Sequence, residues 1–181
     1  MRLFTAVWLD KELRETIRNF LEGISNGSSG IKWVFSEQLH FTLKFLGEQD
    51  SEIISKISPF LSEAAKEFSP FTLALAGGGV FPSRRSPRVL WLGVKEGGAK
   101  LAGLAARVEE AGEKAALPRE KRAFRPHLTI GRVKNSSPFF DGELLTKGIE
   151  GRMTVKSFSL VASSLTPHGP VYQEVEEYFF K

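Results

Sequence analysis

Hydrophobic residues follow two spacings along the chain, and their succession predicts strands interleaved with helices. Residues 2–9 are rich in β-branched and aromatic side chains, which is typical of a buried strand. Asp10 stands where a helix N-cap is expected, and the helix is predicted to run to about Gly23. Its apolar face is indicated by five residues at helical spacing: Leu13, Ile17, Phe20, Leu21 and Ile24.

The rest of the chain continues this mixture of patterns. A second helix is expected after Asp50 and an alanine-rich third helix over 101–117. Further extended segments are predicted at 32–35, 40–46, 71–76, 88–94, 127–133, 154–164 and 171–180. The glycines at 77–79 are expected to end or bulge a strand, and 138–147 is ambiguous, with a short helix as one option. The order of elements predicts a mixed α and β fold, and because no linker divides the chain, one domain spanning 1–181 is expected.

Two of the predicted strands carry the same short motif, histidine, apolar residue, threonine, apolar residue. The first copy is Leu39-His40-Phe41-Thr42-Leu43 and the second is Pro126-His127-Leu128-Thr129-Ile130. Residues two apart in a strand share a face, so each motif places an imidazole and a hydroxyl side by side. Period two also predicts that Lys44 shares the face of His40, while Phe45 shares the face of Phe41.

Composition narrows the chemistry that these motifs can support. The 181 residues include no cysteine and only three histidines, so a thiol nucleophile and a disulfide framework are excluded. A metal centre is not expected, because no metal-ligand pattern of histidines is present, and no cofactor is predicted. The net charge of +4 suits an anionic partner. The first apolar run is too short for a membrane span. Charges follow it at once and no small-residue cleavage site appears, so a signal peptide is not indicated and a cytoplasmic location is expected.

A pair of histidines suits metal-independent phosphodiester chemistry. Near neutral pH one imidazole can be neutral and accept a proton from the attacking nucleophile, while the other is protonated and donates to the leaving alkoxide. The threonine hydroxyls can donate hydrogen bonds to phosphate oxygens. A single histidine-x-threonine would more often be structural, but the duplication in two strands favours the catalytic interpretation.

With these motifs in place, the chain resembles the two-histidine phosphoesterase superfamily, and within it the LigT-like RNA 2',3'-cyclic phosphodiesterases. The resemblance covers nearly the whole sequence. It rests on five blocks: residues 2–7, 33–47, 81–82 together with 87–93, 126–133 and 165–172. It implies two pseudo-symmetric α+β lobes of antiparallel sheet with outer helices around a central cleft, each lobe supplying one motif.

The resemblance also implies an activity and a set of roles. Such enzymes open the 2',3'-cyclic phosphate at an RNA 3' end to leave a 2'-phosphomonoester. His40 would be the general acid and His127 the general base, while Thr42 and Thr129 would hold the phosphate. Arg132 matches an arginine common in the family and would bind phosphate or the RNA end. The expected partner is an RNA with a cyclic phosphate terminus, with tRNA fragments as candidates, and the chain is expected to be a monomer.

Other interpretations remain open at this stage. The same site could join 2'-5' linkages in tRNA halves, or the chain could bind RNA ends without turnover. The basic stretch 119–134 and the arginines at 84, 85 and 88 could follow an RNA backbone or simply be solvated. Trp33 and Phe124 could stack on a base or pack in the core. His168 is interpreted as a surface turn residue.

Overall fold

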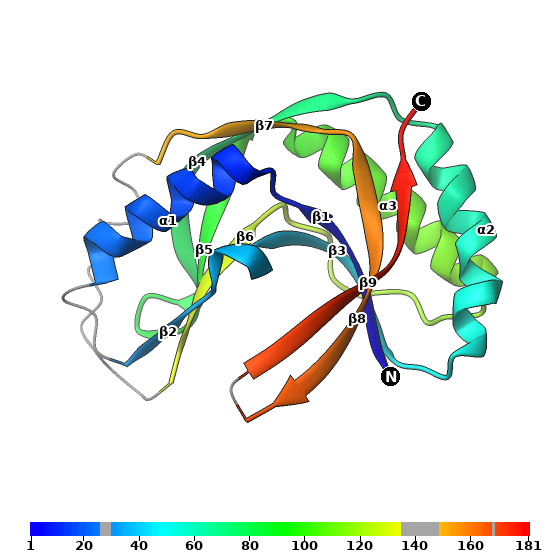
Figure 1. The fold of residues 1–181 in the computed structure, drawn as a ribbon, viewed down its shortest axis with the longest axis horizontal. Coiled ribbons are helices and arrows are strands. Elements are labelled where there is room, and N and C mark those ends of the chain that lie inside the picture. The colour runs from blue at the N-terminus through cyan, green and yellow to red at the C-terminus, as the bar shows by residue number, and fades with distance from the viewer. Residues whose placement is uncertain (26–29, 135–148, 168) are drawn as a thin grey trace.

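A computed structural model describes residues 1–25, 30–134, 149–167 and 169–181, and within them the chain forms three helices and nine strands (Figure 1). The helices are α1 (Lys11–Ser25), α2 (Glu52–Lys66) and α3 (Gly98–Lys114), and a 3₁₀ turn, η1, covers Ser36–Gln38. The strands are β1 (Arg2–Trp8), β2 (Ile31–Trp33), β3 (His40–Glu48), β4 (Phe71–Ser83), β5 (Ser86–Glu96), β6 (Leu128–Val133), β7 (Arg152–Val155), β8 (Ser157–Thr166) and β9 (Gly169–Phe179).

The strands form two antiparallel sheets. The first sheet has the order β3-β1-β8-β9 and the second has the order β2-β6-β5-β4-β7. Each sheet takes strands from both ends of the chain, since β8 and β9 join β1 and β3, whereas β2 joins β6. The first motif therefore lies in one sheet and the second motif in the other.

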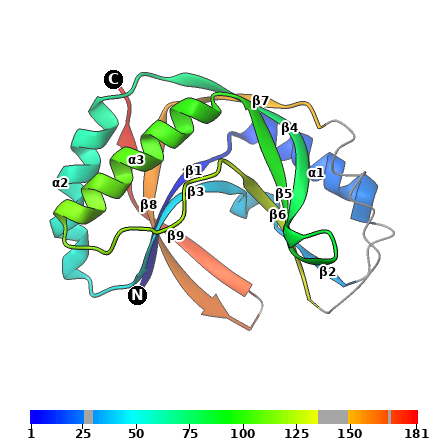
Figure 2. The same cartoon turned by 180° about the vertical axis from the view of Figure 1, so that it is seen from behind.

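Side chains alternate across β1 and so define two faces of the first sheet. Leu3 and Val7 belong to the main hydrophobic core, whereas Phe4 and Ala6 form a smaller buried cluster with Val161 of β8. The helices cover the sheets from outside (Figure 2). Helices α2 and α3 pack on each other and contact β9 and β3, while α1 contacts β7. None of the helices in the described ranges is long and apolar enough to cross a membrane.

The α+β class, the antiparallel sheets and the three helices confirm the sequence predictions, with two differences in detail. Strand β4 continues through the glycines with register shifts between Leu75 and Gly78, so of the two options expected there the bulge is confirmed and the strand end is not. A separate short strand, β7, precedes β8 and was not predicted. The ambiguous segment 138–147 and His168 lie outside the described residues.

Candidate active site

Strand β3 carries the first motif and contains a β-bulge just after it. Thr42 pairs with Ala6 and Lys44 pairs with Thr5, so Leu43 is an extra residue without an opposite partner. The extra residue reverses the faces that follow it. Lys44 is therefore buried, whereas Phe45 is 67% exposed on the face of His40 and Thr42. The prediction that Lys44 shares the histidine face is wrong, because the bulge interrupts period two.

Strand β6 contains an equivalent β-bulge after the second motif. Thr129 pairs with Trp91 and Gly131 pairs with Leu90, so one residue, Ile130, is extra. Arg132 pairs with Val89, which shares its face of β5 with Trp91. The bulge thus brings Arg132 onto the face of Thr129. Arg132 occupies the same place after the second motif that Phe45 occupies after the first.

Both motif histidines are oriented by the same local hydrogen bond. The Nδ1 atom of His40 lies 2.6 Å from the carbonyl oxygen of Gln38, and Nδ1 of His127 lies 2.7 Å from that of Arg125. A carbonyl oxygen can only accept, so each Nδ1 carries the hydrogen and donates it. Each Nε2 is therefore the nitrogen that can take up or release a proton.

Aromatic side chains hold the two imidazoles from the sides. Around His40 the ring centroids of Phe4, Trp8 and Tyr172 lie 5.0, 5.3 and 5.3 Å away. His127 meets Phe81 edge-to-face at 5.4 Å.

Phe81 is itself held in place by the indole of Trp91. The two rings stack at 5.1 Å, and the indole lies over Gly79, where an added Cβ would stand 2.6 Å from its Cζ2. Gly79 therefore makes room for the support of the second histidine.

Burial and nearby charge both shift the pKa of His40. Burial lowers the pKa of His40, the hydrogen bond to Gln38 opposes this effect, and the positive charge of Arg132 lowers the pKa further. Burial also raises the pKa of Tyr172, and the charge of Arg132 acts against that shift. Strands β3 and β6 are in contact, so the two sheets meet at the site. Arg132 of the second sheet therefore lies close enough for its charge to act on His40 and Tyr172 of the first.

The structure thus brings five predicted residues to the two sheet faces that meet here: His40, Thr42, His127, Thr129 and Arg132. Sequence reasoning did not single out Tyr172, Trp8 or Phe81. Tyr172 comes from β9, more than a hundred residues from His40, and only the sheet order makes them neighbours.

Of the other candidates, Trp33 and Phe124 are half-buried and pack against the core, which supports their structural interpretation. The arginines at 84, 85 and 88 are exposed at the β4–β5 hairpin.

Comparison with known proteins identifies the class to which this fold and site belong. The model of the family described as LigT like phosphoesterase matches the chain twice, at residues 7–91 and 92–172. The chain therefore belongs to the LigT-like phosphoesterase family, as the sequence resemblance indicated. The two matches have similar lengths, which agrees with the expected pseudo-symmetry of two lobes.

Individual relatives are similar over their full length. A protein of Archaeoglobus fulgidus named RNA 2',3'-cyclic phosphodiesterase is 44% identical, covering 97% of this chain and 98% of its own. Another of that name, from Aquifex aeolicus, is 35% identical over 99% of this chain and 97% of its own. The crystal structure of E. coli LigT complexed with 3'-AMP superimposes with a TM-score of 0.83 at 28% identity, covering 99% and 98% of the two chains.

Proposed function

We propose that the chain hydrolyses the 2',3'-cyclic phosphate at the 3' end of RNA to a 2'-phosphomonoester. The enzyme class and the substrate follow from the full-length relatives named RNA 2',3'-cyclic phosphodiesterase. The observation that supports a chemical role for this chain's own residues is the matched orientation of His40 and His127. Each has Nδ1 fixed and Nε2 available, on two sheets that meet.

The nucleophilic half of the reaction is assigned to His127. Its neutral Nε2 accepts a proton from a water molecule whose oxygen attacks the phosphorus. A new P–O bond forms while the bond from phosphorus to the 3' oxygen breaks. The phosphate stays attached through the 2' oxygen, which gives the 2'-phosphomonoester.

Protonation of the leaving group is assigned to His40, whose Nε2–H donates a proton to the departing 3' oxygen. After turnover His127 carries the extra proton and His40 is neutral, so exchange with solvent restores both. Because burial lowers the pKa of His40, the empty site favours the neutral imidazole. The bound phosphate anion supports the acid role, because its negative charge stabilises the imidazolium.

The phosphate is assigned to Thr42, Thr129 and Arg132. Both threonines stand two residues after a histidine on the same sheet face, where their hydroxyls can donate to the non-bridging oxygens. Arg132 is exposed on that face of β6 and carries the positive charge closest in sequence to the second motif on its C-terminal side. A guanidinium suits phosphate because it can donate two parallel hydrogen bonds.

We also propose that the chain is one bilobal domain that works as a monomer in the cytoplasm. A single core cluster includes residues of both sheets, such as Leu3 and Leu90, which supports one folding unit. Both histidines come from one chain, so the site is complete without a partner copy. Ends of tRNA fragments remain candidate substrates from the family resemblance.

The experiment is to incubate the protein, in EDTA, with an oligonucleotide ending in a 2',3'-cyclic phosphate and to identify the product after digestion to mononucleotides. A 2'-monophosphate is expected. A 3'-monophosphate would contradict the assigned bond cleavage. Addition of a second RNA with a 5'-hydroxyl end tests the ligase alternative, in which that hydroxyl replaces water. Binding without any product would favour the RNA-end-binding alternative.

A further inference from the structure

We propose that Gln38 is a positioning residue of the two-histidine site: its backbone orients His40, and its side chain holds Tyr172 against that imidazole. The inference rests on the proposed function, since it assigns the residue that keeps the histidine with the acid role in place. It concerns the segment that leads from β2 through η1 to the first motif.

The main chain of Gln38 contacts the first histidine directly. Its carbonyl oxygen accepts the hydrogen bond from Nδ1 of His40 at 2.6 Å, which leaves Nε2 for proton transfer. The η1 turn fixes this carbonyl, because the backbone N–H of Gln38 donates to the carbonyl oxygen of Phe35 at 2.9 Å. The next N–H, that of Leu39, donates to the carbonyl oxygen of Ser36 at 3.3 Å. The backbone of Gln38 is therefore fixed independently of its side chain.

The side chain of Gln38 reaches strand β9. Its Nε2 donates a hydrogen bond to the carbonyl oxygen of Pro170 at 2.7 Å, although 132 residues separate the two in sequence. A carbonyl can only accept, so the amide nitrogen, and not the amide oxygen, must face Pro170. Pro170 stands near the start of β9, two residues before Tyr172. One residue thus contacts both His40 and the strand that carries Tyr172.

Strand β9 is held in its sheet from one side only. It lies at the edge of the order β3-β1-β8-β9, with β8 as its neighbour. Two strands, β1 and β8, therefore stand between Tyr172 and His40 in the sheet, yet their ring centroids are only 5.3 Å apart. The backbone path of β9 must bring the ring there, and the hydrogen bond from Gln38 fixes that path beside the histidine.

The segment before Gln38 belongs to the second sheet, so the same connection joins both motifs. Strand β2 pairs with β6, and the backbone N–H of Val34 donates to the carbonyl oxygen of Ile130, in the second motif, at 2.9 Å. Lys32 of β2 also approaches the start of β9, since a Cβ on Gly169 would stand 3.1 Å from its Nζ. Gln38 therefore stands at the end of a segment that is attached to the second motif.

Tyr172 contributes to the environment in which His40 titrates. Strand β1 supplies Phe4 and Trp8, which carry no charge, and β9 supplies Tyr172. Strand β6 supplies Arg132, whose charge lowers the pKa of His40 in addition to the effect of burial. Loss of the amide hydrogen bond would let β9 and its ring move away. The imidazole would become more exposed, and its pKa would rise toward the ordinary value of about 6.5.

The test replaces the amide by a thioether of similar length in Gln38→Met, which cannot donate to Pro170. The backbone carbonyl that orients His40 remains. With a cyclic-phosphate RNA, kcat should fall by about 10- to 100-fold, the upper figure being the cost of a misplacement of about 1 Å. KM should change little, because the residues assigned to the phosphate are untouched. The pKa of His40, followed by NMR in the free protein, should rise toward about 6.5.

Gln38→Asn is the second variant and serves if Gln38→Met does not fold. It keeps the amide but withdraws it from Pro170 by one methylene, so it should show the same fall in kcat and the same rise in the pKa of His40. Tyr172→Ala should raise that pKa too. Adding Gln38→Met to Tyr172→Ala should raise it no further, because both changes act on one contact.

A matched control is available at the other end of β3. Gln49, just after this strand, also donates from Nε2 to a backbone carbonyl, that of Leu46, at 2.7 Å. Gln49→Met therefore removes the same kind of hydrogen bond away from the histidines. It should leave kcat and the pKa of His40 unchanged.

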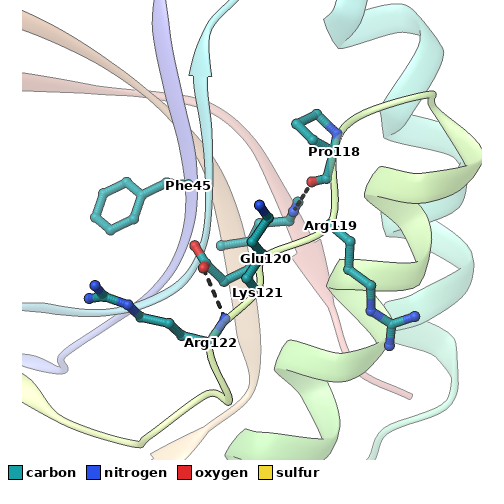
Figure 3. Close-up of a pocket in the computed structure, with 7 residues that line it drawn as sticks. Phe45, Pro118, Arg119, Glu120, Lys121 and Arg122 are labelled. Carbon is teal, nitrogen blue, oxygen red and sulfur yellow. Dashed lines mark hydrogen bonds between the residues drawn. The ribbon is translucent and has the colours of Figure 1, made fainter.

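A link between distant segments on the opposite face of β3 gives a second control. The Lys44 ammonium donates to Glu109 of α3 at 2.6 Å and to the carbonyl oxygen of Pro118 at 3.0 Å. This link lies in a pocket of about 450 Å³ that is lined by Lys44, Phe45 and residues 118–122 (Figure 3). Lys44→Met combined with Glu109→Leu removes the link and should leave the pKa of His40 unchanged.

The outcomes separate this inference from the proposed function. Either an unshifted pKa of His40 or a wild-type kcat in both Gln38 variants would overturn the positioning role and leave the proposed function intact. A shift of the same size in Gln49→Met would also overturn it, since the effect would then not be specific to the link with β9. Absence of turnover by the wild type would instead overturn the proposed function, while the NMR titration would still test the contact that Gln38 maintains.

Discussion

His40 and His127 are held by equivalent hydrogen bonds, each from Nδ1 to the carbonyl oxygen two residues earlier, at 2.6 and 2.7 Å. The equivalence means that local backbone geometry, and not a distant partner, sets the tautomer of both rings. Each sheet therefore carries one imidazole whose Nδ1 is protonated and whose Nε2 is available for proton transfer. The difference between the two comes from their surroundings, since His40 lies among three aromatic rings and near Arg132.

The assignment of acid and base predicts which variant a better leaving group can rescue. Replacing the bridging 3' oxygen of the cyclic phosphate by sulfur gives a thiolate leaving group, with a pKa near 8.5 for an ordinary thiol, that needs no proton. Both His40→Gln and His127→Gln should lose at least about 100-fold in kcat on the oxygen substrate. The sulfur substrate should rescue only His40→Gln. Rescue of His127→Gln instead would reverse the two roles.

The lowered pKa of His40 predicts a shift between two pH profiles. The acid must be protonated, so activity falls as pH rises through the pKa of His40. In kcat/KM this alkaline limb reports the free enzyme, where burial lowers the pKa; in kcat it reports the complex, where bound phosphate raises it. The alkaline limb of kcat should therefore lie at higher pH. Coincident limbs in the two profiles would contradict the role given to phosphate.

The same shift predicts how stability depends on pH. The unfolded chain binds more protons at residue 40 than the folded chain does, so the free energy of unfolding rises with pH through this group. Its contribution is complete above the ordinary histidine value of about 6.5 and is lost as pH falls toward the lower folded value. Urea titrations should show a shallower acid decline in His40→Gln than in the wild type. Parallel declines would count against the lowered pKa.

Gly79 is predicted to be essential for the support of His127. In Gly79→Ala the new Cβ would overlap the indole of Trp91, which would displace Phe81 from its contact with the histidine. Overpacking of this kind costs about 1–3 kcal/mol, and kcat should fall with it. Gly23 of α1 is the control, because no atom in the described part of the chain lies within 4 Å of a Cβ there. Gly23→Ala should be neutral or stabilising by up to about 1 kcal/mol. An active, fully stable Gly79→Ala protein would refute this account.

The buried pair of Lys44 and Glu109 predicts strongly non-additive variants. Their side chains are only 3% and 15% exposed, so Lys44→Met leaves a carboxylate without its compensating charge. The expected loss is about 3–5 kcal/mol in the free energy of unfolding. Lys44→Met combined with Glu109→Leu should recover much of it, since no isolated charge remains. A double variant whose loss equals the sum of the two single losses would show that the pair is not coupled.

The parts of the site that the sequence predicted are those that depend on local periodicity. Period two placed His40 with Thr42 on one face, and the structure agrees because no bulge separates them. Beyond Thr42 the prediction failed, since one extra residue, Leu43, exchanged the faces of Lys44 and Phe45. Nothing in the alternation of apolar and polar residues marks that bulge, because Lys44 is polar and buried.

The sequence also could not predict contacts between segments that lie far apart along the chain. The meeting of Tyr172 with His40 depends on β9 joining the sheet of β3, which no local pattern encodes. The pocket beside Phe45 depends on the ion pair between β3 and α3 in the same way. The fold class was accessible because the order of elements, and the resemblance of five separated blocks, extend over nearly the whole chain.

The most direct test of the two-histidine account is single-turnover hydrolysis of an RNA ending in a 2',3'-cyclic phosphate, in EDTA, by the wild type, His40→Gln and His127→Gln. The predicted result is a 2'-phosphomonoester from the wild type and a rate lower by at least about 100-fold in each variant. Loss of wild-type activity in EDTA, or near-normal rates in either variant, would contradict it.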